Sequence, residues 1–230
     1  MLTYSERFKR YYKKFPVTTI ILTINAIMVT ITMFAGGFNN PTLTKLGALV
    51  PEKVINDGEY YRLLTMTILH GGIIHFLANS LFLFYIGSFF EKLMGRPKYI
   101  LVYVVSGLGS SLLITWLGVP DNVTIGASGA LFGVLGSLLV LTYIKKEWFH
   151  PAFISSVRSI TIINLVFTFV IPNISIFGHL GGFLTGGILI YFITPNKPKI
   201  KFLFKKNSEK KYNDNIIDHD DISDDDVLFH

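Results

Sequence analysis

The sequence contains no cysteine and few charged residues for its length. Among 230 residues there are 2 Trp, 0 Cys and 16% charged side chains, against a 50% share of hydrophobic residues. Without cysteine, neither a disulfide framework nor a thiolate metal site can form. With so little charge and a mean hydropathy of +0.49, the chain is too apolar for an ordinary soluble domain. We therefore predict an integral membrane protein.

Apolar runs of bilayer length recur along the chain. A helix needs about 20 mainly apolar residues to cross the hydrocarbon core of a bilayer. We predict an all-α membrane protein with six transmembrane helices, at residues 17–35, 67–90, 99–117, 125–144, 157–171 and 174–193. A long external loop, residues 36–66, separates the first two. The domain organisation is then a basic N-terminal segment (1–16), a six-helix domain (17–194) and a tail (195–230) that is basic and then acidic.

The basic residues indicate how the helices are oriented. Of the 21 Lys and Arg residues, all fall on one side of the predicted bundle except Lys45, Lys53 and Arg62. The positive-inside rule makes the majority side cytoplasmic, so both termini are expected in the cytoplasm. The net charge of +6 is therefore attributed to membrane flanks, and no nucleic-acid partner is expected. The acidic tail lacks the apolar residues needed for a core and is predicted to be disordered.

Several polar side chains fall inside the predicted spans, where they are energetically expensive and often functional. They are His70, His75 and Asn79 in the second span, Ser128 in the fourth and His179 in the sixth. Even-numbered spans all run from outside to inside, and each of these residues lies in the first half of its span. We therefore expect them at one depth, in the outer half of the membrane.

Glycines in the fourth and sixth spans permit close helix contact. They recur at near four-residue spacing, at Gly126, Gly129, Gly133 and Gly136, and at Gly178, Gly182 and Gly186. Small residues let helix backbones approach in lipid, which would bring Ser128 to His179. A neutral imidazole can take the proton of a serine as it attacks a carbonyl, and Asn79 and His75 could donate to the developing oxyanion. Taken singly, each residue also fits a packing role; their combination favours catalysis.

Three motifs resemble those of the rhomboid intramembrane serine proteases. They are "GASG" around Ser128, "HGGIIHFLANS" from His70 to Ser80, and "GHLGGFLTG" from Gly178 to Gly186. The likeness extends to Arg62 in "EYYRLLT" and to Glu91 at the cytoplasmic end of the second span, and it covers about residues 46–193. It implies a six-helix rhomboid bundle with Ser128 as nucleophile and His179 as general base.

The resemblance also assigns the surrounding residues. Asn79, His75 and the Ser128 backbone amide would form the oxyanion hole. Structural roles near the site would fall to His70, Gly126, Phe132, Gly182, Gly186, Arg62 and Glu91. No metal and no cofactor are implied. Phe132 departs from the family pattern, because many relatives carry a tyrosine there, packed on the catalytic histidine.

The resemblance further implies partners and a location. Substrates would be single-span membrane proteins cut in or beside the span. We expect a bacterial plasma membrane as the location, with the active site opening toward the external face. Two alternative functions fit the sequence less well. A pseudoprotease that binds clients without cutting them usually lacks a dyad residue, and both are present here. A transporter would be expected to carry inverted repeats or midplane ionisable residues, and the sequence has neither.

Overall fold

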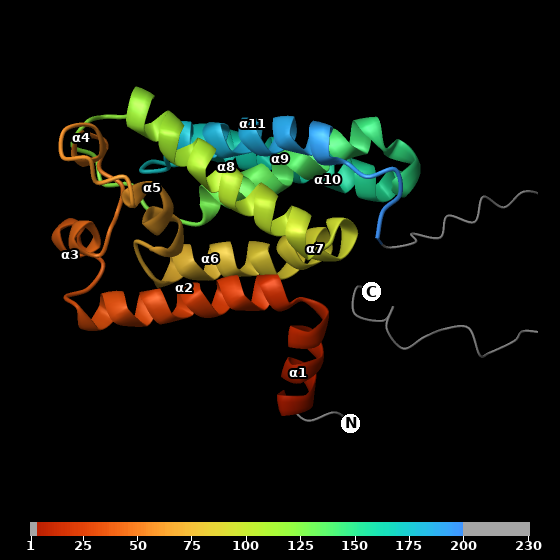
Figure 1. Ribbon diagram of the computed structural model, residues 1–230, viewed down its shortest axis with the longest axis horizontal. Helices are drawn as coiled ribbons and strands as arrows, with labels where there is room; N and C mark the ends of the chain where they lie inside the picture. The colour runs from red at the N-terminus through yellow and green to blue at the C-terminus, as the bar shows by residue number, and fades with distance from the viewer. Residues whose placement is uncertain (1–3, 200–230) are drawn as a thin grey trace, which may run out of the picture.

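The structure, a computed structural model, describes residues 4–199, and within that range helices dominate (Figure 1). The long ones are α2 (Pro16–Phe34), α6 (Ile73–Phe82) continued through the π-helical turn η2 (Leu83–Gly87) into α7 (Ser88–Met94), α8 (Arg96–Leu117), α9 (Ser128–Ile144), α10 (Pro151–Val170) and α11 (Ile176–Ile193). The short ones are α1 (Tyr4–Lys14), α3 (Asn40–Lys45), α4 (Pro51–Ile55), α5 (Arg62–Thr65), η1 (Met66–Ile68) and η3 (Lys146–Trp148). The prediction of an all-α protein is confirmed. The predicted tail from residue 200 onward lies outside the described range.

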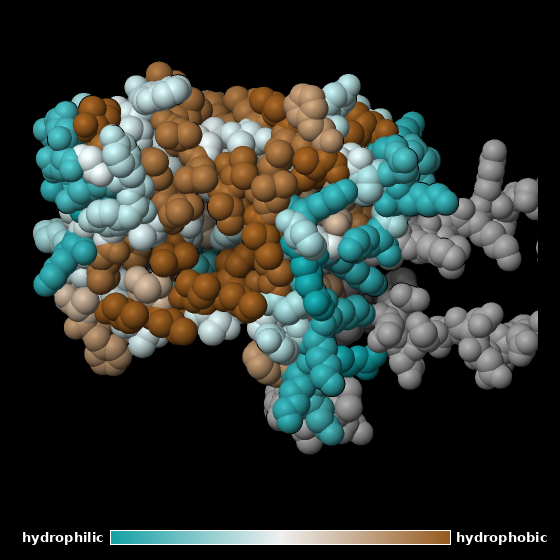
Figure 2. Space-filling view, viewed as in Figure 1, coloured by the Kyte–Doolittle hydropathy of each residue, from teal (hydrophilic) through white to brown (hydrophobic). Residues whose placement is uncertain are grey.

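The long helices form a bundle with a membrane-like surface. Among the described residues, 5 helical segments are long and apolar enough to cross a membrane: Pro16–Phe34, Ile73–Met94, Arg96–Leu117, Pro151–Val170 and Ile176–Ile193. The fourth predicted span is the shorter apolar helix Ser128–Ile144, whose 17 residues extend about 25 Å. Figure 2 shows a broad hydrophobic band across the molecule with hydrophilic side chains gathered at its two ends. The protein is an integral membrane protein.

The largest differences between the predicted spans and the structure are at the starts of the second and fifth spans. The second span begins at Ile73, so His70 lies in the loop before it rather than in the helix. The fifth begins at Pro151, earlier than predicted, because Pro151 supplies a preorganised first helical residue. Arg158 therefore lies inside α10, and its guanidinium sits 4.4 Å from the Tyr143 ring centroid. An aromatic face stabilises a cation in this position.

Small residues form the centre of the bundle, where α8, α9 and α11 all pack against one another. A methyl group added at Gly182 would collide with the Gly129 carbonyl oxygen, and one added at Gly186 would collide with that of Gly133. A Cβ at Gly133 would collide with the Ser106 side chain of α8 and would lie 3.0 Å from the Gly182 carbonyl oxygen of α11. The expected contact between the fourth and sixth spans is therefore present, and it is made backbone to backbone.

The segment 36–72 is folded onto the end of the bundle that carries the start of α9 (Figure 1). Leu49 and Thr124 form an antiparallel bridge, with N–O distances of 2.9 and 2.8 Å. The Gly126 amide donates to the Met66 carbonyl at 2.9 Å. These bonds fix the chain immediately before Ser128, so the loop contributes to the position of the proposed nucleophile.

Arg62 holds this loop together. Its side chain is buried, and one guanidinium nitrogen donates to the carbonyl oxygens of Thr44 at 2.8 Å and Ala48 at 2.7 Å. It also pairs with Glu59, and this hydrogen bond holds the pKa of the Glu59 carboxyl below its ordinary value. A carboxyl whose pKa is lowered on folding stabilises the fold above its unfolded pKa. That contribution is lost as the pH falls through the lowered value.

We expect Arg62→Ala to lower the thermal unfolding temperature in detergent while the protein retains catalytic activity. The substitution leaves buried carbonyls without a donor, which costs about 1–3 kcal/mol. Lys53→Ala is a matched control, since Lys53 lies in the same loop and its partly exposed side chain makes a surface ion pair with Asp57 at 3.5 Å, a kind of contact that contributes little to stability. Differential scanning fluorimetry measures both variants. Unchanged stability in Arg62→Ala combined with complete loss of cleavage would instead give Arg62 a direct catalytic role.

Candidate active site

Ser128 is the first residue of α9 and lies at the wall of a cavity of about 700 Å³. The backbone N–H groups of a helix's first turn have no partner within the helix, and the helix dipole favours negative charge at this end. The turn before Ser128 depends on Gly126, whose φ of +128° is rarely adopted by other residues. A Cβ at Gly126 would also lie 2.9 Å from the His75 ring. The local backbone thus provides anion-binding donors next to the serine hydroxyl.

His179 reaches the same cavity from α11. Its ring is stacked on Phe132, with centroids 3.9 Å apart and planes inclined by 18°. Its Nδ1 lies 2.8 Å from the Thr168 hydroxyl of α10. The residues adjacent to Ser128 and His179 in sequence are themselves in contact, because a Cβ at Gly129 would lie 3.3 Å from the Gly178 carbonyl oxygen. The imidazole is therefore fixed in orientation, with Nε2 as its remaining polar atom.

Asn79 and His75, both on α6, line the cavity as well. The Asn79 side-chain nitrogen is buried and has no hydrogen-bond partner among the described residues. The His75 Nδ1 accepts a hydrogen bond from the Gly71 amide at 3.4 Å. A neutral imidazole that accepts at Nδ1 carries its proton on Nε2, and the Nε2 side of His75 faces Gly126. Both residues therefore present N–H donors close to Ser128.

Other residues proposed for the site lie outside the cavity wall. His70 is buried behind His75, with ring centroids 5.2 Å apart in an edge-to-face arrangement. Gly182 and Gly186 form the helix contact described above, and Arg62 belongs to the external loop. Glu91 lies in α7, where its carboxylate accepts hydrogen bonds from the amides of Val17 at 3.0 Å and Thr18 at 2.8 Å. Glu91 thus caps the first turn of α2 and has no contact with the cavity.

The structure adds residues that sequence reasoning missed. Asn164 and Asn173 line the cavity, and Thr168 contacts His179. Asn173 is the one non-glycine residue of the described chain with a positive φ, of 63°. Threonine is common in apolar spans, so neither hydropathy nor composition distinguishes Thr168 as a residue of the site. The four-residue spacing of Asn164 and Thr168, on one helix face, was the available signal.

Comparisons with known proteins identify the family. A family model described as "Rhomboid domain" matches residues 57–196. RHOMBOID-like protein 4 of Arabidopsis thaliana is 36% identical over 178 residues, covering 74% of this chain and 43% of the relative. Rhomboid protease GluP of Bacillus subtilis is 34% identical over 171 residues, covering 74% and 33% respectively. The putative rhomboid protease YdcA of the same species is 28% identical over 203 residues, covering 88% of this chain and 100% of the relative.

The chain spans under half the length of the first two of these relatives, whereas it matches the third from end to end. The matched region includes every residue of the cavity discussed above, from His75 to His179. Motifs, helical architecture and family match agree with one another. The chain belongs to the rhomboid family.

Proposed function

We propose that this protein is an intramembrane serine endopeptidase that cleaves single-span membrane proteins in or beside their transmembrane segment. The observation that carries the proposal is the cavity of about 700 Å³ shared by Ser128, His179, Asn79 and His75. These side chains come from α6, α9 and α11, so the constellation depends on the tertiary fold. The cavity also has the size typical of a ligand site.

The proposed chemistry follows from the donors and acceptors of this cavity. Ser128 Oγ attacks the scissile carbonyl carbon while His179 Nε2 takes the hydroxyl proton. The carbonyl oxygen becomes negatively charged and is stabilised by the Ser128 amide, Asn79 and His75. The imidazolium then gives its proton to the leaving amine, and an acyl-serine remains. Water, deprotonated by His179, hydrolyses this ester and restores the serine. The scheme needs no metal or cofactor.

A substrate helix has to unwind locally before it can be cut. A peptide bond inside a helix is shielded by the turn around it, so the substrate backbone has to unwind before Ser128 can reach its carbonyl. Substrates with small or helix-weakening residues near one end of the span are therefore favoured. With both termini proposed in the cytoplasm, the cavity would open toward the external face. We propose a bacterial plasma membrane as the location.

Reconstitution with a panel of single-span proteins tests the proposal. Purified protein in liposomes is mixed with each candidate, and any cut is mapped by mass spectrometry. We expect cleavage at one or a few bonds in or beside the span, absent with Ser128→Ala. Ser106→Ala is a matched control, because its hydroxyl is buried in the same bundle and has no hydrogen-bond partner among residues 4–199. Binding without cleavage throughout the panel, unchanged in Ser128→Ala, would support a non-proteolytic client-binding role.

A further inference from the structure

The hydrogen bonds around Thr168 determine which nitrogen of His179 carries a proton. The Thr168 hydroxyl lies 2.8 Å from the Asn164 carbonyl oxygen and 2.8 Å from His179 Nδ1. A hydroxyl has a single hydrogen to donate. The Asn164 carbonyl can only accept, and helical threonines commonly donate to the carbonyl four residues earlier. In the contact with His179, the imidazole therefore acts as donor and the Thr168 oxygen as acceptor.

The geometry points to Thr168 as a positioning residue that holds His179 in the tautomer protonated at Nδ1. This inference rests on the proposed function and deepens it. A neutral imidazole with its proton on Nδ1 has an unprotonated Nε2, which is the form that can accept the Ser128 proton. When Nε2 takes that proton, the Nδ1–H bond to Thr168 is retained and stabilises the cation. Thr168 itself gains and loses no proton, and Phe132 fixes the ring plane.

A pair of threonine variants in one helix tests this role. Thr168→Val keeps the shape of the side chain and removes the acceptor, whereas Thr168→Ser keeps the hydroxyl. We expect Thr168→Val to lower kcat by about tenfold to a hundredfold with little change in KM, because the base is no longer held in its productive form. Thr168→Ser should restore most of the rate. Thr161→Val is the matched control, since Thr161 is buried in α10 and makes the same bond to its own helix, to Val157 at 2.7 Å.

The nitrogen NMR shifts of His179 provide a readout independent of activity. In the full-length protein with labelled histidine, neutral His179 is expected to be protonated at Nδ1, and Thr168→Val should increase the Nε2-protonated form. A wild-type His179 protonated at Nε2, or a wild-type kcat in Thr168→Val, would overturn the inference. The two proposals fail separately. If Ser128→Ala is inactive while Thr168→Val is fully active, only the Thr168 role is wrong; cleavage by Ser128→Ala would overturn the protease assignment itself.

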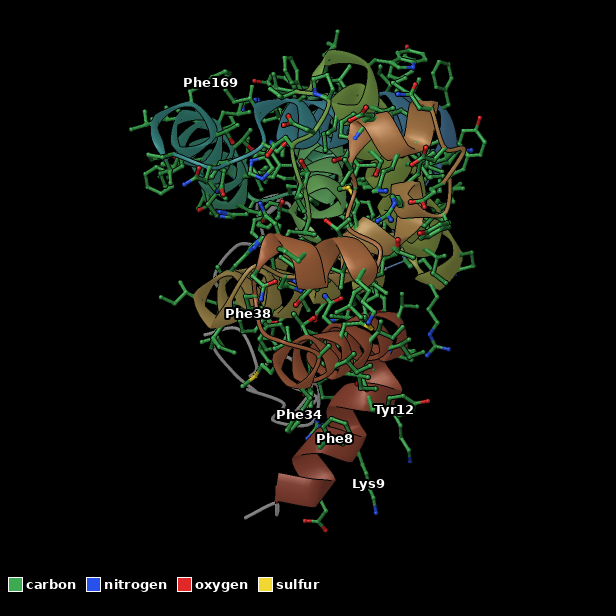
Figure 3. The ribbon with its side chains drawn as sticks, turned by 90° about the vertical axis from the view of Figure 1, so that its left-hand side faces the viewer. Phe8, Lys9, Tyr12, Phe34, Phe38 and Phe169 are labelled. Carbon is green, nitrogen blue, oxygen red and sulfur yellow. The ribbon has the colours of Figure 1, made fainter. Side chains whose placement is uncertain are left out.

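A second, independent observation concerns α1, which runs across the direction of the membrane-spanning helices (Figure 1). It is docked by Tyr11, whose ring stacks on Phe84 with centroids 4.9 Å apart and whose hydroxyl lies 2.5 Å from Ser88 Oγ. Figure 3 shows α1 extending beyond the outline of the bundle, with Phe8, Lys9 and Tyr12 on its surface. A helix that crosses the direction of the membrane-spanning helices would run along the membrane surface.

The surface of α1 is amphipathic, and its apolar face borders a groove. Phe8 and Tyr12 are 61% and 47% exposed, one helical turn apart. With the outer face of α2 they border an open groove of about 360 Å³, lined by Phe8, Tyr12, Thr19, Ile20, Thr23 and Ile24. Lys9 and Lys13 are exposed on the adjoining face of the helix. An apolar slot beside cations matches an acyl chain linked to a negatively charged headgroup.

We infer that the corner between α1 and α2 binds an anionic phospholipid of the membrane, with an acyl chain along Ile20 and Ile24 and the headgroup phosphate at Lys9 and Lys13. Charge complementarity selects this ligand over a zwitterionic lipid, because helix α1 carries five basic residues and only one acidic residue, Glu6. Docking through Tyr11 means that α1 is already in place before the lipid binds. The bound lipid would anchor the N-terminal helix to the membrane surface.

The test compares the full-length protein in phosphatidylcholine nanodiscs with and without phosphatidylglycerol. We expect phosphatidylglycerol to raise the unfolding temperature and to be retained in native mass spectrometry. Lys9→Gln with Lys13→Gln should weaken retention by about fivefold for each lysine, and Phe8→Ala should weaken it further. Lys45→Gln with Lys53→Gln, at the other end of the molecule (Figure 1), should have no effect. The inference would be overturned if the protein retained phosphatidylcholine as well as phosphatidylglycerol, or if the Lys9/Lys13 and Lys45/Lys53 variants retained phosphatidylglycerol equally. It would also be overturned if inorganic phosphate alone raised the unfolding temperature as much as phosphatidylglycerol does.

Discussion

Ser128→Ala is expected to abolish detectable cleavage of a reconstituted substrate, His179→Ala is expected to lower the rate by about a hundredfold to ten-thousandfold, and the double variant should be as inactive as Ser128→Ala. The loss expected in His179→Ala is that of a positioned general base. Members of one catalytic unit are strongly non-additive, because removal of the first already prevents the step that the second assists. Initial cleavage rates in liposomes, at equal amounts of folded protein, measure the three variants.

Stability measurements separate this loss from misfolding. The Ser128 side chain faces a cavity, so alanine should leave the unfolding temperature close to that of the wild type. His179→Ala removes a ring stacked on Phe132 and is expected to be somewhat less stable. Its activity is therefore compared after correction for folded fraction. Cleavage that survives in Ser128→Ala and falls further in the double variant would mean that Ser128 and His179 act independently, against a dyad.

Gly182→Ala is expected to reduce cleavage by about a hundredfold with both Ser128 and His179 present. The added methyl group would collide with the carbonyl oxygen of Gly129 and lie 2.7 Å from its carbonyl carbon. Backbone atoms cannot relieve a clash by a rotamer change, as a side chain can, so α9 and α11 must separate. Overpacking of this kind also destabilises a fold by about 1–3 kcal/mol. Cleavage rate and unfolding temperature are both measured.

Gly187→Ala provides the matched control for this prediction. Gly187 lies on the same helix, but a Cβ there would be 3.4 Å from Val140 and 3.7 Å from the Gly136 carbonyl oxygen, which is ordinary contact. This variant should retain nearly full activity and should be slightly more stable, because alanine favours helix over glycine. Equal cleavage rates and unfolding temperatures in Gly182→Ala and Gly187→Ala would mean that the close approach of α9 and α11 at Gly182 is unimportant.

The sequence predicted the helical class and the close contact of the fourth and sixth spans, because both depend on local composition. Apolar runs indicate a bilayer, and glycines at four-residue spacing place small residues on one helix face. The predicted start of the second span was wrong, because the loop that contains His70 is itself apolar. Hydropathy therefore does not distinguish this loop from the helix that follows it. The fifth span was predicted too short because Pro151, Ser155 and Ser156 read as loop residues ahead of the apolar run, whereas α10 begins at Pro151.

Contacts between segments that are distant in the sequence could not be predicted. The bridge of Leu49 to Thr124 and the contact of Thr168 with His179 join parts of the chain that only the tertiary fold brings together. Neither leaves a periodic pattern in the sequence. The orientation of α1 relative to α2 likewise depends on the stacking of the Tyr11 ring on Phe84. Residue types can therefore suggest a nucleophile and a base, but not the side chain that orients the base.

Covalent labelling of the purified, membrane-reconstituted protein with a fluorophosphonate tests the central claim most directly. A serine activated by a neighbouring imidazole attacks the phosphorus and displaces fluoride, and the adduct is located by mass spectrometry of the peptides. We predict one adduct, on Ser128, that is lost in Ser128→Ala, strongly reduced in His179→Ala and unchanged in Ser106→Ala. An unlabelled Ser128 in protein that cleaves its substrate, or cleavage that persists in Ser128→Ala, would contradict the account.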